Sequence, residues 1–501
     1  MKCVIASYDH FGRGITHIDG KITFVKGVRV GDSVDIDIIK DKKKYSIGKV
    51  NEPKNYSSIF CPYYYSCGGC HLEQLDYSEQ LEFKKEKALN ILNRYAGINL
   101  DKISIIDSVD KYYRNKVVFH IEEDKIGYYE EESNKLLDID KCYLVNNNIN
   151  KIYLTIKEFI KTNKELKEVM IRSFDNNSMI AFTGNCDIER LDYFKDKVDS
   201  CYLNEKLVFG SDKIKTKIFD LDFYVGRDAF FQVNSNGLES IYKEVIDIAK
   251  SKDINTILDL YCGTGTISLL VSRYVRKVYG VEIIKEGIVD ANYNKKINNI
   301  DNVEFFCMDA KDFLEKYNKE IDMIIVDPPR SGLSNSARRL LLDKKCNNII
   351  YISCDLMSFA RDIKELSSEY EIESIKLVDE FPNTYHVETV VLLSHKKPDG
   401  HINVKVEFGE GEGKVPLDNI AKRAEEYKPK ERVTYKMIKE YIEAKYGFKV
   451  HTAYIAEVKR DLGLPMYDAP NAVEELKQPR KHPTAEKVEA IKDALKHFEV
   501  I

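Results

Sequence analysis

The sequence predicts an α/β domain with a doubly wound, mostly parallel sheet, preceded by a small β-barrel and an α+β domain and followed by a helical extension. Between residues 256 and 354, apolar runs that each end at a polar residue are separated by helix-length segments. Residues 1–50 contain short alternating runs divided by glycine turns. After residue 430 the periodic segments are amphipathic helices.

The composition sets broad limits on function. With 501 residues, the chain is long enough for three or four domains. No apolar run reaches eighteen residues and the first ten residues lack a signal-peptide apolar region, so we expect a cytoplasmic protein that is neither secreted nor membrane-spanning. The eleven cysteines are better explained as thiols, metal ligands or a nucleophile than as disulfides.

Residues 1–52 are expected to form an OB-like β-barrel, because alternating runs of strand length are evenly spaced by glycine turns. The net charge of −5 argues weakly against a polyanionic partner, but residues 1–50 carry ten Lys/Arg against six Asp/Glu. Any nucleic-acid surface is therefore local. The run Lys42-Lys43-Lys44 is typical of a solvated hairpin tip, and on an OB-like barrel it would equally contact phosphates.

Four cysteines form a candidate metal site. Cys61, Cys67 and Cys70 are separated by five and then two residues, and Cys142 at the end of a predicted strand is the nearest candidate for a fourth thiol. Four thiolates fit either tetrahedral zinc or a 4Fe-4S cluster. Zinc sites more usually have two pairs of closely spaced cysteines, so the spacing here favours a cluster over zinc. Buried free cysteines are the remaining alternative.

Residues 53–225 alternate strand-like pieces with one amphipathic helix, which indicates a central α+β domain that holds these cysteines. Part of residues 78–100 is expected to pack on the catalytic domain instead. The stretch from Tyr112 to Phe119 mixes aromatic residues with Arg114 and Lys116. Such a mixture can stack bases and hold phosphates, or it can form half-buried sheet.

The stretch from Thr256 to Glu282 has the pattern of a βαβ unit with a tight glycine turn at Gly263 and Gly265. Glycines let the backbone approach a ligand at the start of a helix, and an acidic residue that ends the second strand suits the two hydroxyls of a ribose. The third glycine of a dinucleotide fingerprint is replaced, and Asp259 lies four residues before Gly263. This departure favours S-adenosylmethionine over NAD.

Several later strands also end at a polar residue. In a doubly wound sheet, ligands lie outside the carboxyl ends of the strands. The last two predicted strands are joined by a Pro-containing loop, so the final strand, which begins at Glu388, must run antiparallel and return to the same rim. The residues expected at this rim are Asp259, Glu282, Asp309, Asp327, Cys354 and Glu388.

With these residues in place, the sequence closely resembles the RNA uracil-5-methyltransferase family, specifically its iron–sulfur branch that acts on 23S ribosomal RNA (the RumA type). The resemblance covers residues 1 to about 396. It is carried by the N-terminal barrel, which is TRAM-like, by the four cysteines, and by "AFFQVN", "DLYCGTGT", "DPPRSGL", "YISCD" and "FPNTYHVETV". As a set, these pieces are highly specific.

The resemblance implies a Rossmann-like, seven-stranded methyltransferase domain over residues 226–397, behind the TRAM/OB-like barrel and the iron–sulfur domain. It identifies Cys354 as the nucleophile and Glu388 as the general base. Tyr261 and Thr266 stand where the family more often has other residues. Together with the glycine turn, the resemblance gives as cofactor-binding residues Gln232, Tyr261, Gly263, Thr266, Glu282, Asp309 and Asp327.

The implied reaction is S-adenosylmethionine-dependent methylation of carbon 5 of a uridine in 23S ribosomal RNA. Carbon 5 of uracil is a poor nucleophile, so a thiolate must first add to carbon 6, and a base must later remove the carbon-5 proton. Phe230 is a candidate to stack on the target base once it leaves its own stack. The alternatives are a transfer-RNA uracil methyltransferase, which typically lacks the cysteines, and a non-catalytic RNA-binding or assembly factor.

Residues 398–501 lie outside this resemblance. They are expected to form a linker with a short strand (397–414), two amphipathic helices with helix-turn-helix character broken at Gly447, and a final helix. Many such helix pairs only pack within their own domain, so the role of this extension is left open. We expect a monomer with ribosomal RNA as its partner and no membrane contact.

Overall fold

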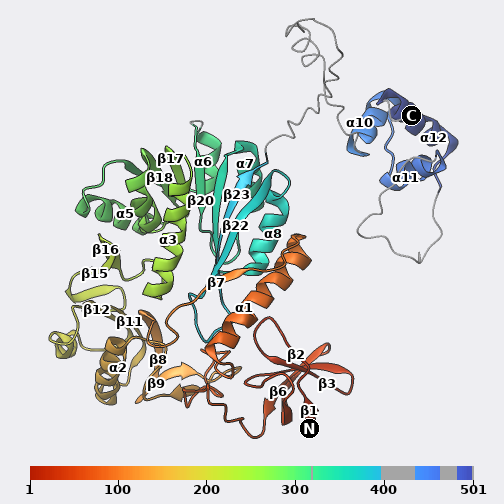
Figure 1. The fold of residues 1–501 in the computed structure, drawn as a ribbon. Helices are drawn as coiled ribbons and strands as arrows, with labels where there is room; N and C mark the ends of the chain where they lie inside the picture. The colour runs from red at the N-terminus through yellow and green to blue at the C-terminus, as the bar shows by residue number, and fades with distance from the viewer. Residues whose placement is uncertain (176, 318–319, 397–434, 463–481, 499–501) are drawn as a thin grey trace, which may run out of the picture. The chain divides into compact units, whose positions relative to one another are not determined.

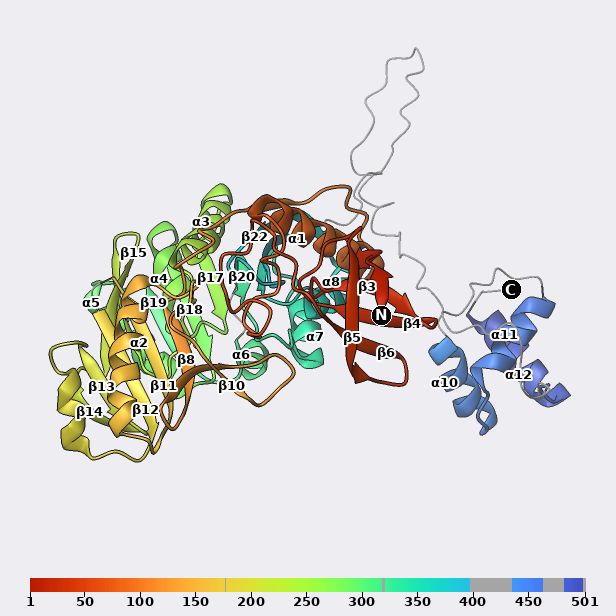
Figure 2. The same ribbon diagram turned by 90° about the horizontal axis from the view of Figure 1, so that it is seen from below.

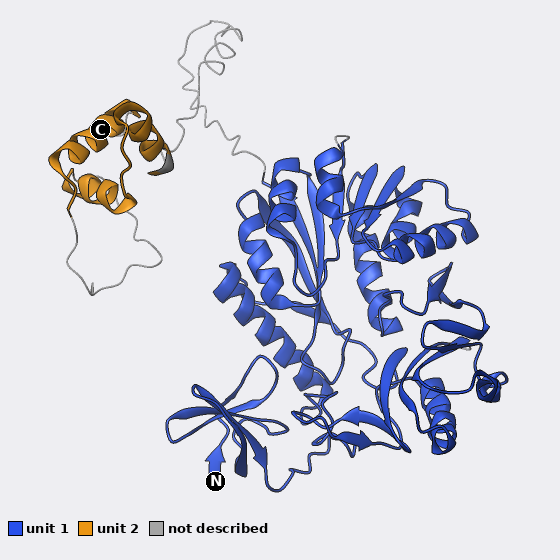
Figure 3. Cartoon of the chain, turned by 180° about the vertical axis from the view of Figure 1, so that it is seen from behind, with its two compact units in different colours: residues 1–400 blue, residues 401–501 orange. Residues whose placement is uncertain are grey.

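The computed structural model describes residues 1–175, 177–317, 320–396, 435–462 and 482–498. The chain divides into two units, Met1–Gly400 and His401–Ile501 (Figure 3). The linker and short strand predicted for 397–414 lie outside the described residues. No helix in the described ranges is both long enough and apolar enough to span a bilayer.

The alternating runs near the N-terminus form a six-stranded sheet in the order β1-β5-β6-β4-β3-β2. Val25, Val34 and Ile36 belong to its buried core, and the exposed and buried residues of β5 alternate as a half-buried strand requires. The three-lysine run from Lys42 to Lys44 is exposed between β5 and β6. The strands are β1 Lys2–Val4, β2 Ser7–Tyr8, β3 Gly14–Ile18, β4 Lys21–Val25, β5 Ser33–Asp41 and β6 Tyr45–Val50.

A second, seven-stranded sheet has the order β10-β9-β8-β11-β12-β13-β14 and packs against one amphipathic helix, α2. Asn146 caps α2 by accepting a hydrogen bond from the backbone of Ile149. The elements are β8 Lys116–Glu122, β9 Lys125–Tyr129, β10 Leu136–Asp138, α2 Asn147–Phe159, β11 Leu166–Phe174, β12 Asn177–Gly184, β13 Ser200–Leu203 and β14 Lys206–Gly210. The hairpin β15 Lys213–Ile218 and β16 Leu221–Gly226 follows and joins the core of the next sheet.

The largest sheet has eight strands in the order β19-β18-β17-β20-β21-β23-β22-β7. Its strands are parallel except for β23, which runs antiparallel to both neighbours as predicted. The eighth strand, β7 Ser104–Ile106, was not predicted, because three residues are too few for a periodic pattern. The others are β17 Thr256–Leu260, β18 Lys277–Glu282, β19 Val303–Cys307, β20 Met323–Val326, β21 Asn348–Ser353, β22 Tyr370–Val378 and β23 Glu388–His395.

Helices cover both faces of this sheet (Figures 1 and 2). The helix α1 comes from the segment between the barrel and the central sheet, yet Ala88 and Ile91 at its end belong to the core of the large sheet. Residues 77–106 are thus built into the large sheet and its cover. The helices are α1 Tyr77–Ile91, α3 Ser235–Ser251, α4 Thr266–Val271, α5 Lys285–Ile297, α6 Ala310–Lys316, α7 Asn335–Lys344 and α8 Leu356–Leu366.

The second unit contains α10 Tyr435–Tyr446, α11 Thr452–Asp461 and α12 Ala485–His497. Gly447 has a φ of 73° and ends α10, in the left-handed conformation that favours glycine. The three helices share one apolar core that includes Ile442, Ile455 and Ile491.

Candidate active site

The loop after β17 is shaped for close approach to a ligand. Gly263 and Gly265 have φ angles of 54° and 78°, and Tyr261 adopts a φ of 66°, which is uncommon for a residue with a side chain. A Cβ added at Gly265 would lie 2.5 Å from the ring of Phe305. Only glycine therefore fits there, and Tyr261 holds the type of backbone strain that clusters at binding sites.

Two acidic residues lie at or near the ends of the neighbouring strands: Glu282 ends β18, and Asp309 follows the end of β19 by two residues. The carboxylate of Glu282 accepts hydrogen bonds from the backbone N–H of Gly263 (3.2 Å) and of Ile284 (2.9 Å). Asp309 caps α6 by accepting a hydrogen bond from Lys311 N at 2.8 Å. Glu282 is thereby fixed directly beside the glycine turn.

Asp259 does not lie at the rim, contrary to the prediction. Its side chain is fully buried and accepts a 2.5 Å hydrogen bond from Ser268 Oγ. Asp259 lies one residue before the end of β17. Because side chains alternate between the two faces of a strand, its side chain points toward α4 and not toward the carboxyl end of the sheet. Thr266 is likewise buried, with its Oγ1 3.1 Å from Thr264 Oγ1.

The segment before α3 presents one exposed ring and one buried amide. Phe230 is 70% exposed, whereas the side chain of Gln232 is buried and its backbone carbonyl accepts a 3.0 Å hydrogen bond from Asn115 Nδ2. The buried guanidinium of Arg172 donates to the carbonyl of Ala229 at 2.7 Å. The central domain therefore fixes the backbone on both sides of Phe230.

The antiparallel pairing of β21 with β23 brings the predicted nucleophile and base together. Ser353 lies opposite Thr389, so the next pair in this register is Cys354 and Glu388. Cys354 is half-buried and stands just before Asp355, which caps α8. The side chain of Glu388 is almost fully buried.

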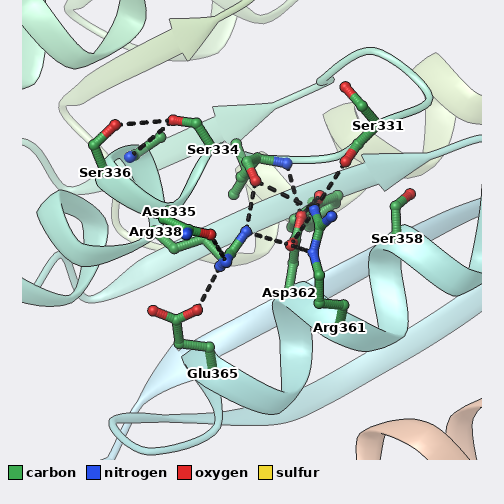
Figure 4. Close-up of polar contacts among 12 residues, drawn as sticks. Ser331, Ser334, Asn335, Ser336, Arg338, Ser358, Arg361, Asp362 and Glu365 are labelled. Carbon is green, nitrogen blue, oxygen red and sulfur yellow. Dashed lines mark hydrogen bonds and ion pairs between the residues drawn. The ribbon is translucent and has the colours of Figure 1, made fainter.

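The loop that follows β20 is anchored next to this pair. Asp362 of α8 is fully buried and binds the guanidinium of Arg338 at 2.9 Å (Figure 4). The same carboxylate accepts hydrogen bonds from Leu333 N and from the hydroxyl of Tyr351, both at 2.7 Å. Because Tyr351 belongs to β21, this network fixes the loop relative to Cys354.

Burial and charge determine the protonation of the site. Burial raises the pKa of Glu388 to about 8; the charge of Asp327 also raises it and Arg330 lowers it. Burial raises the pKa of the Cys354 thiol to about 12, again with Glu388 raising it and Arg330 lowering it. Burial alone raises the pKa of Asp327 to about 7. A cation that entered this site would lower all three pKa values.

The four predicted metal-binding cysteines line one cavity of about 360 Å³ in the central domain. Burial raises the pKa of Cys61 to about 12 and that of Cys70 well above its ordinary value. The backbone N–H of Cys142 donates to Asn150 Oδ1 at 3.0 Å, which fixes the fourth cysteine. The cavity wall also includes Arg330, so it reaches the catalytic domain.

Comparison with known proteins gives the family. The family model for tRNA (uracil-5-)-methyltransferase matches residues 188–396, and the TRAM domain model matches residues 5–50. An uncharacterized RNA methyltransferase of Clostridium acetobutylicum is 34% identical over 439 residues, which cover 78% of this chain and 95% of the relative. The chain belongs to the RNA (uracil-5-)-methyltransferase family.

Two further relatives of this methyltransferase agree. An uncharacterized RNA methyltransferase of Aquifex aeolicus is 33% identical over 424 residues, with 79% of this chain and 99% of the relative covered. The crystal structure of the Pyrococcus abyssi tRNA (uracil-54, C5)-methyltransferase in complex with S-adenosyl-L-homocysteine has a TM-score of 0.65 and 28% identity, and the match covers 78% of this chain and all of that one. The resemblance found in the sequence is thereby confirmed for the family, the α/β methyltransferase fold and the TRAM domain.

Within the described ranges, the methyltransferase has no group of three or more His, Cys, Asp or Glu side chains that could hold a metal ion. The four cysteines share one cavity, but they do not form such a group. A single zinc ion requires thiolate sulfurs about 2.3 Å from the metal. In a 4Fe-4S cluster each thiolate binds a different iron, so the sulfurs lie farther apart.

Sequence reasoning missed two features of the methyltransferase site. Arg330 is a charge partner of both Cys354 and Glu388. An arginine directly after two prolines at a strand end was a usable signal. The loop before Glu388 is bound by distant segments through Asn383 and Tyr385, which is a tertiary feature without a local pattern.

The raised pKa of Glu388 predicts that this carboxylate destabilises the folded methyltransferase. A carboxyl group whose pKa is higher in the folded chain takes up protons on folding, so stability falls as the pH rises from about 4.5 to about 8. We expect Glu388→Gln to raise the unfolding temperature at pH 8 by about 2–4 °C, and by less at pH 6. Thermal unfolding across this range tests it, with Glu371→Gln, an exposed glutamate on β22, as the control. Equal destabilisation by Glu388→Gln at every pH would contradict the prediction.

Proposed function

We propose that this methyltransferase transfers a methyl group from S-adenosylmethionine to carbon 5 of a uridine in 23S ribosomal RNA through a covalent adduct with Cys354. One observation carries the proposal. Cys354 and Glu388 lie opposite each other where β21 ends and β23 begins, in a buried environment that they share with Asp327. A thiol and a carboxyl are the two groups that this reaction requires.

Each group has one task in the cycle. The Cys354 thiolate adds to carbon 6 of uracil, and the electron pair moves through carbon 5 to the carbonyl oxygen at carbon 4. Carbon 5 of the resulting enolate then takes the methyl group from the sulfonium. Glu388 removes the carbon-5 proton, the 5,6 double bond re-forms and the thiolate leaves. Arg330 lowers the pKa of both groups and so favours their reactive, ionised forms.

The proposed cofactor-binding residues include the glycine turn and Glu282, which is hydrogen-bonded to it. The sulfonium of S-adenosylmethionine is a cation, and it would offset the carboxylates of a rim in which Asp327 has a raised pKa. The carboxylate of Glu282 suits the ribose hydroxyls, and the left-handed turn gives the ligand room to approach the backbone. The proposed set is Gln232, Tyr261, Gly263, Thr266, Glu282, Asp309 and Asp327.

Two surfaces support RNA as the substrate. Phe230 is largely exposed on a backbone held by Arg172, so its ring is available to stack on a base that has left its own stack. The exposed lysines 42–44 of the TRAM barrel are placed to contact phosphates. Binding by the barrel is therefore expected to weaken with increasing salt.

The four cysteines are proposed to hold a 4Fe-4S cluster with a structural role. Anaerobically purified protein is expected to be brown and to contain about four irons and four sulfides per chain. Cys70→Ala should lose both, whereas Cys186→Ala, a half-buried free cysteine that does not line the cavity, should lose neither. One equivalent of zinc without sulfide would contradict the cluster.

Mapping 5-methyluridine in RNA from cells with and without this gene tests the proposed target. Loss of one or more methyl groups from 23S ribosomal RNA is the expected result. The matched family model and the structural relative are both named for tRNA, so a tRNA uridine is the second candidate. Loss from tRNA alone would select it, and no loss from either RNA would favour a non-catalytic RNA-binding or ribosome assembly factor.

A further inference from the structure

The loop directly before the proposed base, residues 379–387, is bound by segments far from it in the sequence. The backbone N–H groups of His71 and Leu72 both donate to the carbonyl of Asn383, at 2.8 and 3.1 Å. Gln80 of α1 donates to Asn383 Oδ1 at 3.0 Å and accepts from Asn383 N at 2.9 Å. The cysteine segment and α1 therefore fix the first half of this loop.

Tyr385 fixes the second half, three residues before Glu388. Its ring lies 5.0 Å from that of Phe11 in the barrel, 4.6 Å from His71 and 4.2 Å from His386, as centroid distances. The ammonium of Lys87 on α1 lies 5.0 Å from the centre of the Tyr385 ring, and it donates to the Tyr385 carbonyl at 2.8 Å. Tyr385 thus joins the barrel, the cysteine segment and α1 to the loop of the base.

The contacts of this ring are mainly those of neutral aromatic groups. Burial lowers the pKa of His386 to about 4, so its imidazole is neutral at neutral pH. Aromatic pairs of this kind stabilise a fold beyond the contribution of their buried area. Several such contacts on one ring restrict its position, and with it the backbone that continues to Glu388.

The barrel residue that contacts Tyr385 is itself held in place. Phe11 precedes Gly12, whose φ of 79° and close neighbour Leu72 exclude a side chain: an added Cβ would lie 2.2 Å from Leu72 Cδ2. The carbonyl of Gly12 accepts a hydrogen bond from Gln74 Nε2 at 3.2 Å. The turn that carries Phe11 is therefore fixed to the segment that follows the cysteines.

We propose that Tyr385 is a positioning residue for Glu388, and that its contact with Phe11 ties the position of the base to the RNA-binding barrel. This inference rests on the proposed function, because it assigns Tyr385 to the proton-removal step alone. Addition of Cys354 to uracil and methyl transfer should not depend on it. A displacement of about 1 Å at a reacting group can cost about 100-fold in rate.

Two RNA probes separate these steps: 23S ribosomal RNA transcribed with uridine, and the same RNA transcribed with 5-fluorouridine. Fluorine cannot leave carbon 5 as a cation, so the fluorinated RNA forms a lasting methylated adduct without any need for the base. We expect Tyr385→Ala to form this adduct at the wild-type rate but to turn over uridine RNA about 10- to 100-fold more slowly at saturating RNA. Tyr385→Phe, which keeps the ring, should restore turnover.

Phe11→Ala provides a second variant at the barrel surface. Because it removes one aromatic contact of Tyr385, we expect a loss of turnover of about threefold and unchanged adduct formation. Phe219→Ala is its control, because this phenylalanine of the β15–β16 turn is 42% exposed and Phe11 is 48% exposed. Normal turnover in Tyr385→Ala, or equal losses of adduct and turnover, would overturn the inference. If the wild type formed no adduct with fluorinated 23S RNA or fluorinated tRNA, the proposed function itself would fail, and this inference with it.

Discussion

Cys354→Ala is expected to abolish methyl transfer, with a loss of rate of about 10⁴-fold or more. Without a thiolate, carbon 6 of uracil gains no substituent, and carbon 5 stays too weak a nucleophile to attack the sulfonium. Incubation with 5-fluorouridine RNA and labelled S-adenosylmethionine, followed by a denaturing gel, should show no labelled protein–RNA band. Binding of S-adenosylmethionine should persist, because its proposed contacts lie before α3 and between the ends of β17 and β20, apart from Cys354.

Two other cysteines test whether this loss is specific. Cys3→Ala, a half-buried cysteine of the barrel, should leave the band and the turnover intact. Cys262 lies in the proposed cofactor loop, where burial and the charges of Asp259 and Glu282 raise the pKa of its thiol well above the ordinary value, whereas the charge of Arg330 lowers that of Cys354. An adduct that survived in Cys354→Ala but disappeared in Cys262→Ala would transfer the role of nucleophile to Cys262.

The strand ends of the catalytic sheet were predictable because each is a local signal. The strands β18, β20 and β21 are each located by an apolar run that ends at an acidic residue or a cysteine. Because these strands are parallel, their carboxyl ends lie on the same side of the sheet. The prediction that β23 is antiparallel followed from a loop too short for a crossover. That single inference brings Glu388 to Cys354, and the register of the two strands agrees with it.

Other features depend on contacts that no local pattern encodes. Asp259 ends an apolar run in the same way as Asp327, but it is buried against Ser268 because β17 continues for one more residue. The strand β7 joins the sheet from a segment about 270 residues away from β22 in the sequence. In the sequence, Tyr385 is a single aromatic residue in a loop without a periodic pattern. Two of its three ring neighbours, Phe11 and His71, come from the barrel and the cysteine segment, so its contacts could not be predicted locally.

Glu388→Gln is expected to stop the cycle two steps later than Cys354→Ala, at proton removal. Cys354 can still add to carbon 6, and the methyl group can still be transferred, but the carbon-5 proton has no acceptor at this position. Removal of a positioned general base typically costs about 10²–10⁴-fold, so turnover should fall by that factor while methylated RNA stays bonded to the enzyme. With unmodified uridine RNA and labelled cofactor, this variant should accumulate a labelled protein–RNA band that the wild type shows only transiently.

The pH dependence of proton removal provides a second, independent test of whether Glu388 is the base. Burial raises the pKa of Glu388 to about 8 in the free enzyme, and Arg330 lowers it, so the rate of proton removal should increase with pH as the carboxyl ionises. Arg330→Gln should move that rise to higher pH, because the group that favours the carboxylate is lost. In Glu388→Gln the rise should disappear from the slow residual elimination, whereas Glu371→Gln should keep the wild-type profile. Normal turnover by Glu388→Gln, or an unchanged pH profile, would assign proton removal to another base. Asp327 would then be a candidate, because its charge acts on both Glu388 and Cys354.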